Sequence, residues 1–125
     1  MIDHASLHVG DIAQAKDFYT KALAPLGYSL GAEFPEWKVA GFGIGEKRDF
    51  WLTGDGSSQA NHVAFAAENK AAVDAFYNAG LSAGGTDNGK PGYRKDYGAG
   101  YYAAFLLDPD GHNVEVVFHD PTPSE

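Results

Sequence analysis

The chain has 125 residues and no cysteine, with 17 acidic residues against 9 basic ones and a formal net charge of −8. This length supports one hydrophobic core and is too short for two ordinary domains, so we expect a single domain spanning residues 1–125. Without cysteine there is no disulfide and no thiolate, and any metal must be bound by His, Asp or Glu. The negative charge disfavours nucleic acid and anionic membranes, which leaves a small molecule or a second copy of the chain as partner.

The N-terminal residues, MIDHASLHVGD, have neither the basic region nor the long apolar run of a signal peptide. No stretch approaches the roughly 18 consecutive apolar residues that a membrane span requires. We therefore expect a soluble cytoplasmic protein.

The first half of the chain predicts a strand, a helix and three further strands. After the N-terminal strand, Asp11 is suited to cap a helix, and Gln14 follows at the capping-box spacing. The amphipathic segment that comes next ends near Gly27. Alternating apolar residues then predict strands over residues 28–33, 37–43 and 49–53.

A repeat without gaps relates the second half to the first, because His62 follows His4 by 58 positions and five other residues recur at this offset. These pairs are Ala13/Ala71, Phe18/Phe76, Tyr19/Tyr77, Leu23/Leu81 and Gly27/Gly85. Asn69 takes the cap position of a second helix, and strands are predicted over about 85–87, 101–107 and 113–118. Residues 88–100 are long and glycine-rich, which predicts a surface loop.

Each half has one helix for four strands, so one face of each sheet is expected to remain open. Alternation along the strands places His4, His62 and Glu115 on the side away from the apolar rows. Two imidazoles and one carboxylate suffice to bind a divalent first-row metal. Polar residues on the outer face of a half-buried sheet are also ordinary, so alternation alone leaves both interpretations open.

Other residues are candidates for a substrate site on this open face. Arg94 and Tyr97 belong to a cationic, aromatic loop that would suit an anionic or aromatic substrate, although a plain solvated loop explains it equally well. Tyr101 begins a strand and is a further candidate for substrate contact. Trp51 would stack on the substrate as a wall of the cup, or it would belong to the core. His8 would act as a general base, or it would be a surface residue.

Near the C-terminus, the segment DPDGHN has the composition of a tight turn. His112 in this turn and His119 at the end of the last strand are expected to lie on the surface.

The segments HASLHVGDIAQAKDFYTKALAPLGY, NHVAF and LDPDGHNVEVV resemble the vicinal oxygen chelate superfamily over nearly the whole chain. This group includes glyoxalase I, bleomycin-resistance proteins, fosfomycin-resistance enzymes and extradiol dioxygenases. The resemblance implies an α+β fold in which two βαβββ modules, about 1–57 and about 58–125, form a cup-shaped mixed sheet with helices on the outer face. The cup would form within one chain or between the chains of a homodimer, and a homodimer is the expectation.

The resemblance implies that His4, His62 and Glu115 bind one divalent metal, which would be Zn, Ni, Fe, Mn or Co. Glyoxalase I has a further Glu ligand in the last strand of its first module, and the matching position here is Trp51. Asp49, two residues earlier, would replace it only if the register shifted. Glyoxalase I activity is therefore in doubt.

Extradiol dioxygenases and fosfomycin-resistance enzymes bind their metal through two His and one carboxylate, but this sequence matches neither class cleanly. Extradiol dioxygenases usually carry four modules, and the basic residues of the fosfomycin type are missing after Glu115. The expected function is a metal-dependent lyase, isomerase or dioxygenase acting on a small oxygenated substrate, with Glu115 and His8 as catalytic groups. The alternative is a metal-free binding protein of the bleomycin-resistance kind.

Overall fold

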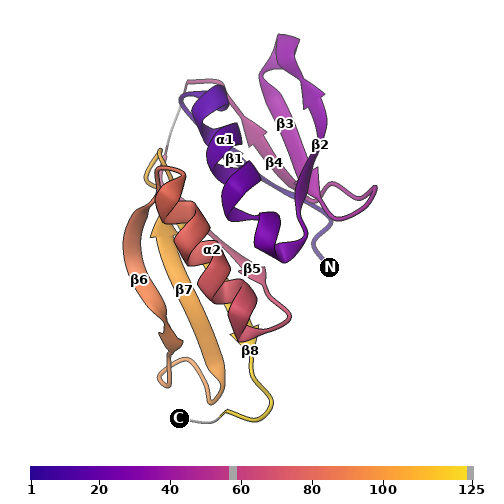
Figure 1. Ribbon diagram of the computed structural model, residues 1–125. Helices are drawn as coiled ribbons and strands as arrows, with labels where there is room; N and C mark the ends of the chain where they lie inside the picture. The colour runs from indigo at the N-terminus through magenta and orange to yellow at the C-terminus, as the bar shows by residue number, and fades with distance from the viewer. Residues whose placement is uncertain (57–58, 124–125) are drawn as a thin grey trace.

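The computed structural model describes residues 1–56 and 59–123 (Figure 1). The first module contains β1 (Ala5–His8), α1 (Ile12–Ala22), β2 (Ser29–Phe34), β3 (Val39–Gly43) and β4 (Phe50–Thr53). The second contains β5 (His62–Ala66), α2 (Lys70–Ser82), β6 (Thr86–Tyr93), β7 (Tyr101–Leu107) and β8 (Asn113–His119). The predicted order of one strand, one helix and three strands is confirmed in both halves.

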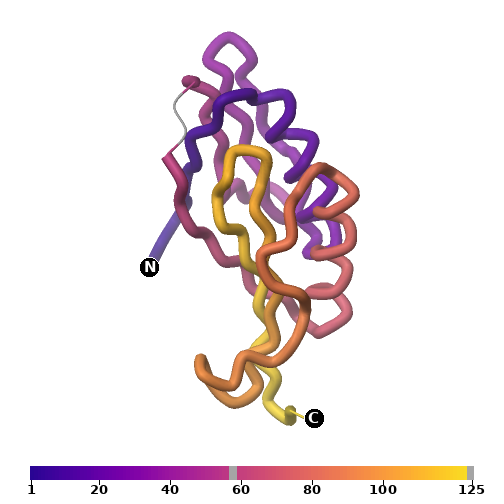
Figure 2. Tube along the Cα trace, turned by 90° about the vertical axis from the view of Figure 1, so that its left-hand side faces the viewer, coloured from indigo at the N-terminus to yellow at the C-terminus, as the bar shows by residue number. Residues whose placement is uncertain are grey.

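Each module forms its own open four-stranded mixed sheet, with strand orders β1-β4-β3-β2 and β5-β8-β7-β6. The first strand of each module pairs in parallel with the last, and the other pairs are antiparallel. The helices α1 and α2 contact each other at the junction of the modules (Figure 1). Figure 2 shows the same arrangement from the side. One face of each sheet is thereby covered.

Both helices begin at the predicted caps. The Asp11 carboxylate accepts hydrogen bonds from the backbone N–H groups of Ala13 and Gln14, and the Asn69 side chain accepts one from Ala72. The residues shared by the repeat, Phe18/Phe76 and Tyr19/Tyr77, are buried on the inner helix faces.

One hydrophobic cluster contains residues of both modules. The Phe65 ring of β5 makes edge contacts with Phe50 of β4 at 5.0 Å and with Tyr28 at 5.5 Å between ring centroids. The two sheets are thus held in a defined relation by shared aromatic packing.

The predicted surface loop over residues 88–100 is wrong for its first half, since β6 runs from Thr86 to Tyr93. The pairing of β6 with β7 is irregular between Asp87 and Gly89 and between Gly89 and Gly92. These bulges interrupt the alternation that would have indicated a strand. The other strand boundaries differ from prediction by one or two residues.

His112 is fully buried, so the prediction that it lies on the surface is wrong. Its Nδ1 accepts a hydrogen bond of 3.0 Å from the backbone N–H of Asn61. The proton is therefore on Nε2, which donates to the His8 carbonyl over 2.8 Å. His112 thus ties the β7–β8 turn to the end of β1.

Two aspartates strengthen this connection between the modules. The Tyr19 hydroxyl donates to the Asp108 carboxylate over 2.6 Å, and the Gly10 N–H donates to Asp110 over 2.8 Å. Burial, with the Asp108 carboxylate beside it, raises the pKa of the Tyr19 phenol well above its usual value. The turn confirmed at residues 108–111 therefore joins the two modules.

Among the helices in residues 1–56 and 59–123, none has the length and apolar character needed to cross a membrane.

Candidate functional site

His62 and Glu115 come together on the open face of the second sheet. The parallel pairing of β5 with β8 brings Ala64 opposite Glu115, and His62 Nε2 lies 3.1 Å from Glu115 Oε1. Glu115 is only 3% exposed, whereas about half of the His62 side chain is accessible. A carboxylate that is buried in this way does not belong to a solvated sheet face, and its pairing with an accessible imidazole makes the two residues a candidate site.

The backbone orients the His62 ring. Its Nδ1 lies 3.0 Å from the Asn113 carbonyl oxygen, which can only accept a hydrogen bond. Nδ1 therefore carries a proton, and Nε2, which faces Glu115, is the atom that could bind a metal in place of a proton. Sequence reasoning missed this role of Asn113, because a backbone carbonyl leaves no signal in the side chain.

Tyr101 holds the second oxygen of the same carboxylate. Its hydroxyl donates to Glu115 Oε2, and its ring makes edge contacts with Tyr97 at 5.3 Å and His119 at 5.4 Å between centroids. Burial, together with the hydrogen bond to Glu115, raises the pKa of Tyr101 to about 12. The phenol therefore remains a donor at neutral pH.

A pH dependence of stability follows from this pKa. Because the folded state raises the Tyr101 pKa from 10.0 to about 12, its stabilising contribution is complete below pH 10 and is lost as the pH rises through about 12. We expect the difference in unfolding free energy between wild type and Tyr101→Phe to shrink across this window. Urea denaturation of both proteins at several alkaline pH values measures it, and a constant difference would contradict the assignment.

The His62–Glu115 pair suits a metal ion. When two side-chain atoms bind the same ion at about 2.0–2.2 Å each, they lie roughly 3 Å apart. The distance between His62 Nε2 and Glu115 Oε1 agrees with this geometry. Within residues 1–56 and 59–123 of a single chain, however, no group of three His, Asp or Glu side chains converges. His4 therefore does not join His62 and Glu115 within the chain.

His4 lies on the open face of the first sheet. It shares a pocket with Ser6, Trp51 and Thr53, as the alternation of the strands predicts. Its Nδ1 lies 2.8 Å from the Asp3 carboxylate, and this hydrogen bond lowers the pKa of Asp3.

Trp51 is the residue that the sequence resemblance matches to the further carboxylate of glyoxalase I. The register of β1 with β4 is unbroken and pairs Ser6 with Trp51. Asp49 is engaged elsewhere, because it accepts a hydrogen bond of 2.8 Å from Tyr28. Burial and this hydrogen bond raise the pKa of Tyr28 to about 12.

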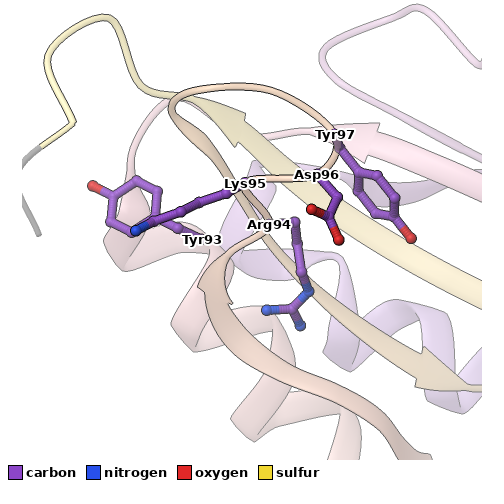
Figure 3. A pocket seen from close by; sticks show the side chains of 5 residues that line it. All are labelled: Tyr93, Arg94, Lys95, Asp96 and Tyr97. Carbon is purple, nitrogen blue, oxygen red and sulfur yellow. The ribbon is translucent and has the colours of Figure 1, made fainter.

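The loop after β6 brings further predicted residues to the second open face. Side chains 93–97 line a cavity and fan out from the loop (Figure 3). The Arg94 guanidinium lies 5.4 Å from the centroid of Phe105, and Phe105 is the partner of Glu115 across β7 and β8. Arg94 and Tyr97 are therefore on the same face as the His62–Glu115 pair.

His8 is placed apart from this pair, at the far end of β1 from His4. Its Nδ1 lies 2.8 Å from the Asp55 carboxylate, and the side chain is half exposed. The carboxylate orients the ring, as it would for a general base.

Comparison with known proteins agrees with the fold. Residues 1–116 match the model of the Glyoxalase/Bleomycin resistance protein/Dioxygenase superfamily. The chain is 32% identical to the uncharacterized protein YqjT of Bacillus subtilis (strain 168), covering 91% of this chain and 95% of that protein. It is similar to the crystal structure of a glyoxalase/bleomycin resistance protein from Albidiferax ferrireducens T118, with a TM-score of 0.76, 28% identity and coverage of 92% and 95%. Lactoylglutathione lyase from Agrobacterium tumefaciens shares the fold, with a TM-score of 0.70, 20% identity and coverage of 94% and 92%.

Proposed function

Because the chain belongs to the Glyoxalase/Bleomycin resistance protein/Dioxygenase superfamily, we propose that it is a metal-dependent lyase, isomerase or dioxygenase. Its substrate would be a small oxygenated molecule that chelates the metal through two oxygens. The observation that carries this proposal is the His62–Glu115 pair, with 3.1 Å between potential ligand atoms and a separate partner orienting each side chain. Such oriented ligands are typical of metal sites.

The proposed metal ligands are His4, His62 and Glu115, and the ion is Zn, Ni, Fe, Mn or Co. Because His4 does not converge with the other two in the described part of one chain, we propose a homodimer in which His4 of the partner subunit completes the site. The open faces of the two sheets would then meet across the dimer. Light scattering that shows a monomer at micromolar concentration would contradict this assembly.

The bound metal would act as a Lewis acid on the substrate oxygens. Tyr101 holds the Glu115 carboxylate in place and, at neutral pH, keeps its own proton. Arg94 and Tyr97 would bind the substrate at the edge of the site, and Trp51 would form a wall. His8, oriented by Asp55, is the proposed base for a proton transfer on a substrate that extends along β1 from His4 toward His8.

Metal analysis tests the proposal directly. We expect the purified protein, after reconstitution, to retain about one divalent ion per chain, and His62→Ala to retain almost none. Wild-type protein that stays metal-free after reconstitution would exclude the enzyme. Glu68→Gln is the control, since this exposed carboxylate of the same module is not a proposed ligand and should leave the metal content unchanged.

The alternative function is a non-catalytic small-molecule-binding protein of the bleomycin-resistance kind. It is favoured by Trp51, which replaces a carboxylate with an apolar wall on the open face of the first sheet. Ligand binding by protein that takes up no metal would support it.

Glyoxalase I activity is tested by measuring turnover of the methylglyoxal–glutathione hemithioacetal. A rate no higher than background would exclude glyoxalase I activity.

A further inference from the structure

A pocket of about 340 Å³ on the open face of the first sheet contains an arginine that has no role in the proposed metal site. Arg48 lines this pocket with the Trp51 indole, two hydroxyl side chains, and His4. A cation next to an aromatic side chain can hold an aromatic anion even in a protein of net charge −8. The sequence offered no signal for Arg48, which lies two residues before β4.

The indole wall is held flat and in place. A Cβ atom at Gly41 would lie only 2.7 Å from the Trp51 ring, so the ring lies directly against this glycine. Trp51 Nε1 donates to the Arg48 carbonyl over 3.1 Å, and Phe34 stacks on the indole with an interplanar angle of 17°. A wall fixed in this way loses little conformational entropy when a ring binds to it.

The Arg48 guanidinium is also held in place, but only part of its hydrogen-bonding capacity is used. Its Nη1 donates to the carbonyls of Gly45 and Lys47, over 2.5 and 2.7 Å. Its Nε is buried and has no hydrogen-bond partner. A guanidinium has five N–H donors in a planar fork. Nη1 is used and Nε is buried, so the capacity that remains for a carboxylate is on Nη2.

An arginine side chain lies near the equivalent glycine of each module, although the two arginines are 46 positions apart and are not partners in the 58-residue repeat. A Cβ atom at Gly31 would lie 1.6 Å from Arg48 Nε, and one at Gly89 would lie 3.2 Å from Arg94 Nη2. Gly89 follows Gly31 by 58 positions, which is the repeat offset, and Arg48 and Arg94 are the arginines of the chain. The same glycine of each module therefore makes room for a guanidinium above the sheet.

We propose that Arg48 and Trp51 bind a planar aromatic carboxylate, with its ring against the part of the indole that lines the pocket and its carboxylate on the guanidinium. The proposal names a substrate class for the proposed function and rests on it. Aromatic stacking and a charged fork provide the two parts of this recognition. Asp3, the carboxylate of the pocket, is engaged in its hydrogen bond with His4.

Calorimetric titration of the full-length protein with 2-naphthoate tests the proposal. The protein is first treated with a chelator, so that the result does not depend on a metal. We expect saturable binding that 2-naphthalenemethanol, which lacks the charge, and acetate, which lacks the ring, do not reproduce. Arg48→Gln should weaken binding at least about tenfold, and Gly31→Ala should do the same by displacing the guanidinium while keeping its charge.

Lys47→Gln is the matched control, since it removes a neighbouring cation that does not line the pocket. Its affinity should equal that of wild type, and circular dichroism checks that each variant folds. Absence of saturable binding, equal losses in Lys47→Gln and Arg48→Gln, or a loss only in Arg94→Gln would each overturn the proposal. Naphthoate binding by protein that takes up no metal would contradict the proposed enzyme and leave this binding site supported.

Discussion

Replacing His112 with alanine is expected to lower the free energy of unfolding by about 3–5 kcal/mol. The side chain is fully buried and accepts from Asn61 while it donates to the His8 carbonyl. Its removal would leave a cavity and two backbone groups without partners at the junction of the modules. Urea denaturation followed by circular dichroism and by tryptophan fluorescence measures the loss.

The control for this prediction is Glu46→Ala, which removes an exposed side chain from the turn before β4. Its effect on stability should stay within about 0.5 kcal/mol, as for most surface substitutions. Similar losses for the two variants would contradict the role of His112 at the junction.

Replacing Glu115 with glutamine is expected to weaken binding of the divalent metal by more than about 100-fold. Substituting a residue that only orients a ligand typically weakens binding by about 10–100-fold, so loss of the charged ligand itself should exceed that range. Glutamine retains the shape of the side chain and an oxygen that can accept from Tyr101, so the fold should survive. Competition with a chromophoric chelator measures the metal affinity.

Two further variants make this prediction specific. Tyr101→Phe removes the hydroxyl that holds Glu115 and should weaken metal binding by about 10–100-fold, less than Glu115→Gln. Glu68→Gln removes an exposed carboxylate from the same module and should leave the affinity unchanged. Equal affinities of Glu115→Gln and wild type would exclude Glu115 as a ligand.

Much of the fold could be predicted because its signals are local. The 58-residue repeat, the caps Asp11 and Asn69, and the alternation of buried and exposed residues in β1, β4 and β5 depend on near neighbours in the chain. Alternation alone also placed Glu115 on the face of β8 away from the helix. The strand β6 escaped prediction because its bulges break the period of two.

The sequence by itself determined the two modules and the side of each sheet on which His4, His62, Trp51 and Glu115 lie, because a strand's alternation decides the face of every residue in it. Only the tertiary structure decided which of them meet. The parallel pairing of β5 with β8 brings His62 to Glu115, and the packing of the modules leaves His4 apart. Tertiary contact likewise buried His112 against the backbones of His8 and Asn61, since hydrogen bonds between distant segments depend on how the modules pack, which no local pattern encodes.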